Sequence, residues 1–190
     1  MDRPENVYDV PQSLPAPEDD GACDHLPGMS MPSVSLTSTV GDPVDLSTLP
    51  GRTVVYCYPL TGRPDQDLPS GWDDIPGARG CTPQSCAFRD HHAELQELGA
   101  RVFGLSTQDT VYQREAAERL HLPFLLLSDE KLEFAEALGL PTFEAEGMTL
   151  TKRLTLVLQE GEIEHVFYPV FPPGRNAEEV VRWLSERITG

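Results

Sequence analysis

The sequence is poor in basic residues and has no long hydrophobic run. Lys and Arg together number 14 against 31 Asp and Glu, which gives a formal net charge of −17 at pH 7. Nucleic acids and anionic membranes both favour a basic protein surface, so this charge argues against both as partners. No stretch approaches the roughly 18 consecutive apolar residues of a membrane span. We therefore expect a protein that binds neither nucleic acid nor membrane.

Cysteine is also scarce, and the first residues show no secretory signal. Four cysteines in 190 residues are too few for a disulfide scaffold. The stretch 1–6 has none of the apolar character of a signal peptide. We therefore expect a cytoplasmic protein whose cysteines are reduced, and no cofactor is predicted.

The first 30 residues differ in composition from the rest of the chain. Prolines are scattered among acidic residues, and apolar residues are few. Such a segment cannot bury a core of its own. We predict an extension over residues 1–30 that is flexible or lies along the surface of a single domain over residues 31–190. Cys23 falls in this extension, and we interpret it as an incidental exposed cysteine.

Two cysteines, Cys81 and Cys86, lie near the start of a predicted helix. The apolar run 54–58 predicts a buried strand ahead of them. Behind them, apolar residues recur with the period of an amphipathic helix, with Thr82 as its N-cap and Gly99 as its C-cap. Cys81 is then placed just before the helix, where unpaired backbone N–H groups and the helix dipole favour a thiolate.

The spacing of the two cysteines limits how they can pair. In one intact α-helix, residues five apart differ by about 7.5 Å in rise and about 140° in direction. Their Cα atoms are then roughly 8–9 Å apart, beyond the roughly 7 Å limit for a disulfide. A Cys81–Cys86 bond therefore requires the first helical turn to unwind, which suits a redox pair better than a structural staple. Two unrelated thiols remain the alternative.

The stretch 81–90, CTPQSCAFRD, resembles the active-site helix of the Q-type, or bacterioferritin-comigratory-protein-like, peroxiredoxins. That subfamily has a peroxidatic cysteine, four residues, a resolving cysteine, and then an aromatic residue, Arg and Asp. The likeness continues in the family's order through LLSD at 126–129, KRLTLVL at 152–158 and EIEHVF at 162–167. The resemblance extends over roughly residues 31–190.

The resemblance implies a thioredoxin-like α/β fold and a thiol peroxidase. Cys81 would be the peroxidatic cysteine, which reduces hydrogen peroxide or an organic hydroperoxide and becomes a sulfenic acid. Cys86 would be the resolving cysteine, which closes an intramolecular disulfide with it. Arg153 and Gln84 would act in the active site, together with Pro59 of the family's tyrosine–proline pair. Thioredoxin or a similar dithiol would reduce the disulfide, and we expect a monomer.

The predicted elements agree with such a fold. Strands and helices alternate, then a β-hairpin and a last helix capped by Asn176 follow, which indicates a central mixed β-sheet with helices on both faces. We predict strands at 33–36, 44–46, 53–58, 101–106, 124–127, 153–158 and 162–168, and helices at 110–120, 131–138 and 176–188.

The chain departs from the family between Pro59 and Cys81. Cys81 follows Pro59 by 22 positions, whereas the family's proline lies seven positions before the peroxidatic cysteine. The simplest account is an insertion of about 15 residues, from 60 to about 75, which contains many Gly, Pro and Asp. It forms either a tolerated surface loop or a lid that shapes the substrate site.

The family's active-site threonine is also missing. Ala78 stands three positions before Cys81, where the family has Thr or Ser. The resemblance assigns that hydroxyl to holding the peroxide and the thiolate, and Ala78 cannot replace it. Thr61, if the insertion loops out, and Thr82 are the two candidates for the role.

Several residues have alternative interpretations. The spacing of Cys81, Cys86 and His91 permits a zinc site, but ligands at five-residue intervals on one helix spread around its axis. Arg153 taken alone suits a surface ion pair in so acidic a chain. Cys57 lies in a strongly apolar strand, and we interpret it as a core cysteine.

Two other functional classes stay open. A thioredoxin-like disulfide reductase or redox sensor is one, although such proteins normally have two residues between their cysteines. A non-catalytic module that binds a metal or a partner is the other. Peroxide consumption that requires Cys81 distinguishes the enzyme from both.

Overall fold

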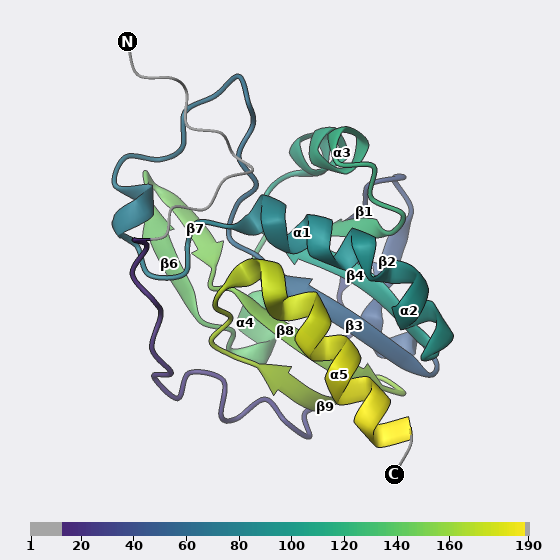
Figure 1. The fold of residues 1–190 in the computed structure, drawn as a ribbon. Coiled ribbons are helices and arrows are strands. Elements are labelled where there is room, and N and C mark those ends of the chain that lie inside the picture. Colours follow the sequence, from purple (N-terminus) through teal and green to yellow (C-terminus); the bar gives the residue numbers. More distant parts are fainter. Residues whose placement is uncertain (1–12, 189–190) are drawn as a thin grey trace.

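The structure, a computed structural model, describes residues 13–188 and is built around a seven-stranded sheet with the order β2-β1-β5-β4-β3-β8-β9 (Figure 1). The strands of this sheet are β1 (Ser35–Ser38), β2 (Pro43–Asp45), β3 (Arg52–Cys57), β4 (Ala100–Ser106), β5 (Leu125–Ser128), β8 (Leu154–Gln159) and β9 (Glu162–Phe167). The helices are α1 (Cys81–Asp90), α2 (His92–Glu97), α3 (Thr110–Arg119), α4 (Glu133–Leu138) and α5 (Asn176–Ile188).

The sheet is mixed, as the sequence predicts. Strands β3, β4 and β5 are parallel, whereas β8 runs antiparallel to β3, β9 to β8, and β1 to β5. The central strands β3 and β8 are buried along nearly their whole length, which explains why their sequences are continuous apolar runs rather than alternating patterns. The predicted hairpin turn between β8 and β9 is also present, with Glu160 and Gly161 at positive φ.

Helices cover the sheet on both faces. In Figure 1, α1, α2 and α5 lie across the front of the sheet, and α4 lies behind it. The front helices share one core cluster with β3 and β4, which includes Phe88, Leu95 and Val180. Phe134 and Leu138 of α4 belong to a second cluster that also contains Cys57, so Cys57 is a core cysteine as predicted. Two packed faces of this kind bury both sides of one sheet.

A stack of aromatic rings fixes helix α1 to the centre of the sheet. The ring centroids of Tyr56 and Phe88 lie 4.5 Å apart, with 6° between the ring planes. The Tyr56 hydroxyl donates a hydrogen bond to Ser85 Oγ at 3.0 Å. A Cβ at Gly104 would come within 2.7 Å of Tyr56 Cζ, so glycine is needed on β4 to leave room for this ring. The middle of α1 is thereby held against β3.

The start of α1 differs from the prediction. Cys81 is the first helical residue, and the N-cap is Gly80 at φ 115°, not Thr82. A Cβ at Gly80 would lie 2.5 Å from Pro173 Cγ, so both the positive φ and the close approach require glycine. The single helix predicted here is also interrupted at His91, which separates α1 from α2.

The extension is not loose over the part that the structure describes. Cys23 and Leu26 are 6% and 0% exposed, and they pack with Met31, the first residue after the extension, in the same core cluster as α4. The backbone N–H of Gly28 donates to Ile163 O at 2.8 Å, and Ser30 forms an isolated bridge with the edge strand β9. The prediction that Cys23 is exposed was therefore wrong, and the domain begins before residue 31. Residues 1–12 of the extension lie outside the described residues.

A second, two-stranded sheet was not predicted from the sequence. It consists of β6 (Thr142–Ala145) and β7 (Met148–Thr151), which are antiparallel. In β6 exposed and half-buried residues alternate, whereas burial in β7 increases along the strand, from the exposed Met148 to the buried Leu150 and Thr151. This hairpin lies beside the end of the main sheet that carries the start of α1 (Figure 1).

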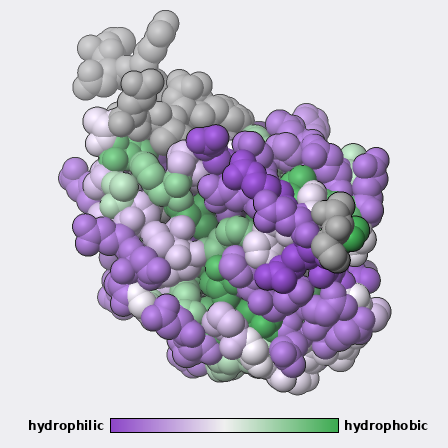
Figure 2. Space-filling view, turned by 60° about the horizontal axis from the view of Figure 1, so that its bottom comes forward, coloured by the Kyte–Doolittle hydropathy of each residue, from purple (hydrophilic) through white to green (hydrophobic). Residues whose placement is uncertain are grey.

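Hydrophilic side chains cover most of the face drawn in Figure 2, and hydrophobic residues show through between them. Over residues 13–188, no helix has the length and hydrophobicity needed to cross a membrane.

The buried N-terminal segment leads to the first prediction. Leu26→Ala should lower the free energy of unfolding by about 2–5 kcal/mol, the usual cost of truncating a fully buried leucine. Val40→Ala is the matched control, because Val40 is 63% exposed. Urea denaturation of both variants measures the difference. Equal midpoints for Leu26→Ala and the parent protein would show that this segment does not belong to the folded domain.

Candidate active site

Cys81 lies in a closed environment with two hydrogen-bond donors. Its side chain is 3% exposed, although it occupies the first turn of a helix. Arg153 Nη2 lies 3.2 Å from Cys81 Sγ, and the backbone N–H of Leu60 donates to the same sulfur at 3.4 Å. Both contacts stabilise negative charge on sulfur, because charge-assisted hydrogen bonds are the strong ones.

Arg153 is buried and held by oxygen atoms that carry no full charge. It lies directly before β8, is 3% exposed, and donates to Ala78 O at 2.8 Å and to Gly77 O at 3.3 Å. Its Nη1 donates to Gln84 Oε1 at 2.6 Å. Within residues 13–188, no carboxylate forms an ion pair with Arg153. Its interpretation as a surface ion pair was therefore wrong, and the nearest group able to take a negative charge is the Cys81 sulfur.

A row of buried amide and hydroxyl groups fixes the orientation of Gln84. Gln84 Nε2 donates to Asn176 Oδ1 at 3.1 Å, and Thr155 Oγ1 donates to the same oxygen at 2.6 Å. All three side chains are completely buried. Asn176 was predicted only as a helix cap, and its contact with Gln84 was missed because the two residues are 92 positions apart. The signal available in the sequence was a polar residue at the start of a helix, which normally indicates capping.

Pro59 lies next to the site, directly before the residue whose backbone contacts the Cys81 sulfur. Pro59 is buried where the chain leaves β3, and Leu60 then directs its N–H at the Cys81 sulfur. The Thr61 hydroxyl donates to Gln108 Oε1 at 3.0 Å instead of turning toward the sulfur. Among the residues that the structure describes, no threonine hydroxyl bonds to Cys81, and a backbone N–H is in its place. This donor has no signature in the sequence, because every residue except proline carries one.

The structure does not bring Cys86 to Cys81. Both cysteines are free, and both lie in the unbroken helix α1. Cys86 is half-buried, and burial raises the pKa of its thiol, an effect that the Arg89 charge opposes. Burial also raises the pKa of Cys23, to about 12. These thiols are therefore poorer nucleophiles at neutral pH than an ordinary cysteine.

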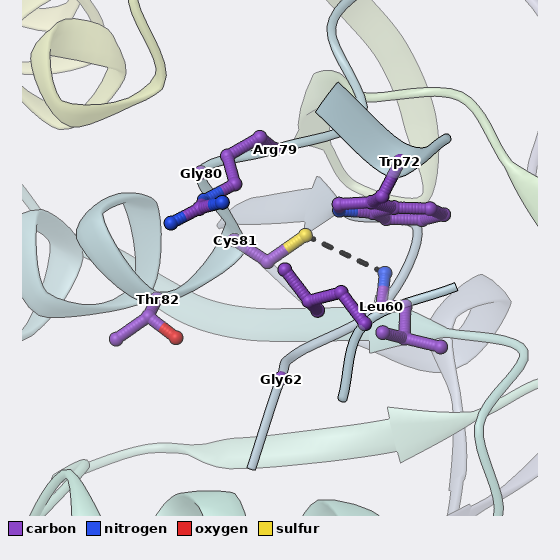
Figure 3. Close-up of a pocket in the computed structure, with 8 residues that line it drawn as sticks. Leu60, Gly62, Trp72, Arg79, Gly80, Cys81 and Thr82 are labelled. Atoms are coloured by element: carbon purple, nitrogen blue, oxygen red, sulfur yellow. Dashed lines mark hydrogen bonds between the residues drawn. The ribbon is translucent and has the colours of Figure 1, made fainter. Parts of the chain in front are cut away.

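A narrow pocket opens above the Cys81 sulfur (Figure 3). Its volume is about 10 Å³, roughly the room that one water molecule needs. In the figure the sulfur points between Trp72 and the backbone nitrogen of Leu60. Thr82 also lines the pocket and is buried. A small electrophile that enters here meets the sulfur directly.

The zinc interpretation finds no support in the geometry. No group of three His, Cys, Asp or Glu side chains within residues 13–188 is arranged to hold a metal ion. His91 instead contacts Glu94 at 2.9 Å.

Taken together, the contacts of Cys81 suit a thiolate nucleophile beside a fixed cation, with hydrogen-bond donors for an oxygen that gains negative charge.

Comparison with protein families gives one match that covers most of the chain. The model described as Redoxin matches residues 26–181. Peroxiredoxin Q of Sedum lineare chloroplasts is 34% identical over 160 residues, which cover 83% of this chain and 77% of that protein. Peroxiredoxin Q of rice, Oryza sativa subsp. japonica, is also 34% identical, but the chain spans only 66% of its length.

Solved structures show the same fold. Peroxidoxin BcpB from Mycobacterium tuberculosis superposes with a TM-score of 0.67 at 26% identity, over 85% of this chain and 98% of that one. A PrxQ mutant from Xylella fastidiosa gives a TM-score of 0.68 at 19% identity, over 86% and 98% of the two chains. The predicted thioredoxin-like α/β fold, with a mixed sheet between helices, is thereby confirmed.

The contact between Arg153 and Cys81 leads to the second prediction. Arg153→Met should slow the alkylation of Cys81 by iodoacetamide at neutral pH by on the order of tenfold or more, because the thiolate loses its cation. The rate is measured by mass spectrometry in a Cys86→Ser background, so that the buried Cys23 and Cys57 are the only other thiols. Arg182→Met is the matched control, because the Arg182 side chain is 62% exposed. An unchanged rate in Arg153→Met would exclude the guanidinium as the group that activates Cys81.

Proposed function

The chain belongs to the peroxiredoxin Q group of the redoxin family, and from that premise we propose that it reduces hydroperoxides through the Cys81 thiol. The observation that carries the proposal is the pair of donors, Arg153 Nη2 at 3.2 Å and Leu60 N–H at 3.4 Å, on a cysteine that begins a helix. Hydrogen peroxide and organic hydroperoxides are the proposed substrates, and water and alcohols are the products.

The first step is nucleophilic attack by sulfur. The Cys81 thiolate attacks the terminal peroxide oxygen, and an S–O bond forms while the O–O bond breaks. Sulfur supplies both electrons, so Cys81 becomes a sulfenic acid, and the leaving oxygen takes up a proton and departs as water or alcohol. Arg153 and the Leu60 N–H stand where charge moves from sulfur to oxygen, which is where preorganised donors lower the barrier.

The second step involves Cys86. Its sulfur attacks the sulfur of the Cys81 sulfenic acid, a disulfide forms, and water leaves. The Cα atoms of residues five apart in an intact helix are roughly 8–9 Å apart, beyond disulfide range. The first turn of α1 therefore has to open, and bonds such as Gln84 N–H to Gly80 O at 3.1 Å are lost.

The cycle closes through an external dithiol. A protein such as thioredoxin exchanges thiols with the Cys81–Cys86 disulfide, becomes oxidised itself, and returns both cysteines to the reduced state. Because both thiols belong to one helix of one chain, no second subunit is needed to complete the site. We accordingly propose that a monomer is the active form.

A coupled assay tests the proposed function. Purified protein, thioredoxin, thioredoxin reductase and NADPH are mixed with hydrogen peroxide, and oxidation of NADPH is followed. Turnover that disappears in Cys81→Ser supports the peroxidase. Reduction of an added protein disulfide, without consumption of peroxide, would favour the disulfide reductase instead.

The roles of the two cysteines give the third prediction. Cys81→Ser should abolish peroxide reduction, whereas Cys86→Ser should consume about one equivalent and stop as a sulfenic acid, because only Cys81 has both a helix start and two donors. Dimedone labelling and intact mass measure the trapped species. If Cys86→Ser were inactive and Cys81→Ser consumed one equivalent, the two roles would be reversed.

The opening of the first turn of α1, which the disulfide requires, gives the fourth prediction. Stoichiometric peroxide should increase hydrogen exchange over residues 82–87, at a cost of about 0.5–1.5 kcal/mol for each lost backbone bond. Strands β3, β4 and β8 should stay protected, and Cys86→Ser treated in the same way should show no increase. An unbroken helix from Thr82 in the disulfide form would contradict this. A Cys81 bond to Cys23 or Cys57 in peptide mapping would do the same.

A further inference from the structure

The insertion before α1 is a packed part of the domain rather than a loose surface loop. Trp72 is 3% exposed and forms a small core cluster with Leu60, Ala78 and Leu150. Its ring centroid lies 6.0 Å from that of Phe143 on β6. The β6–β7 hairpin therefore supports the insertion, and the indole lies beside the Cys81 sulfur (Figure 3).

The insertion is also anchored at several points. Arg79 Nη1 lies 3.0 Å from both carboxylate oxygens of Asp73, in the short 3-10 helix Trp72–Asp74. The Arg79 side chain is only 5% exposed, so this pair is shielded from solvent more than an ordinary surface ion pair. The backbone N–H of Ser70 donates to Glu146 Oε1 on the hairpin side at 3.0 Å. The 3-10 helix that carries Trp72 is thus anchored to Arg79, which lies two residues before Cys81 in the sequence.

The anchored insertion decides how much space is left at the sulfur. The pocket above Cys81 is lined on its apolar side by Leu60, Leu68 and Trp72. Its volume of about 10 Å³ accommodates roughly one water molecule. Hydrogen peroxide, with two oxygens and no carbon, is the smallest hydroperoxide, whereas a branched or aromatic carbon skeleton is several times larger. A bulky substrate therefore cannot reach the sulfur unless the indole moves.

We propose that Trp72 sets the size limit for the substrate, so that the protein prefers hydrogen peroxide and disfavours bulky organic hydroperoxides. This inference rests on the proposed peroxidase function and specifies its substrate class. Trp72 acts by exclusion, because packing against Phe143 and the anchored Asp73 keep it in place. The rejected group is the carbon skeleton, and the peroxide oxygens still meet the sulfur, Arg153 and the Leu60 N–H.

The direct test compares two peroxides in one background. In Cys86→Ser protein, the rate of sulfenic acid formation is measured with hydrogen peroxide and with cumene hydroperoxide. Trp72→Ala should raise the ratio of the cumene rate to the hydrogen peroxide rate by about tenfold or more, the scale on which pockets discriminate small apolar groups. Trp183→Ala is the matched control, since Trp183 stacks on His165 at 4.8 Å and does not line the pocket.

The opposite result is equally informative. A ratio that falls in Trp72→Ala would show that the indole binds organic substrates, and an unchanged ratio would show that it has no part in selection; either overturns the proposal. Asp73→Asn keeps the indole and removes the charge of its anchor, so it should raise the ratio by a smaller factor. If Trp72→Ala fails to fold, the rate ratio of Asp73→Asn tests the size limit, and an unchanged ratio overturns it.

A measurement without peroxide separates this inference from the proposed function. Alkylation of Cys81 by iodoacetamide and by a bulky fluorescein maleimide is compared in the same variants. Trp72→Ala should accelerate the maleimide more than the iodoacetamide, and equal acceleration would overturn the size limit. If the parent protein reacts with neither peroxide, the peroxidase proposal fails, while the alkylation ratio still decides whether Trp72 restricts access.

Discussion

The buried guanidinium of Arg153 is the charge on which the rest of the site depends. A cation that is 3% exposed needs compensation, and two backbone carbonyls and an amide oxygen provide only part of it. The remaining partner is the Cys81 sulfur, to which Arg153 Nη2 donates at 3.2 Å. The Arg153 guanidinium thereby connects three segments: the residues before β8, the 77–78 turn and the first turn of α1.

Two parts of helix α1 then have opposite requirements. The first turn holds Cys81 against Arg153, but a disulfide with Cys86 requires that turn to open. The later part carries Phe88, whose ring stacks on Tyr56 at 4.5 Å in the middle of the core. Opening past Phe88 would expose a fully buried aromatic ring, which adds about 1.5–3 kcal/mol to the cost of the broken backbone hydrogen bonds. The stack therefore limits how far the proposed unwinding extends along the helix.

The position of an element could be predicted where its own residues form a recognisable pattern or motif. The strand at β3, the cysteine pair on α1 and Arg153 beside β8 are all marked by local pattern or by the family motif. The Leu60 N–H could not be predicted, because a backbone donor is common to nearly every residue. The contact between Gln84 and Asn176 depends on two distant segments meeting. Burial of Cys23 and Leu26 was missed because the surrounding prolines and acids dominate the composition of the extension.

The N-terminal segment has a consequence for the open edges of the sheet. An unpaired edge strand is a template on which another chain can add, and it is a common origin of aggregation. Strand β9 is one edge, and the segment around Gly28 and Met31 hydrogen-bonds to its first part through Ile163 and Gly161. The other edge, β2, is only 3 residues long and begins with Pro43, which lacks a donor. Residues 28–31 thus cover the start of one edge, and the other edge offers few free donors on which a further strand could pair.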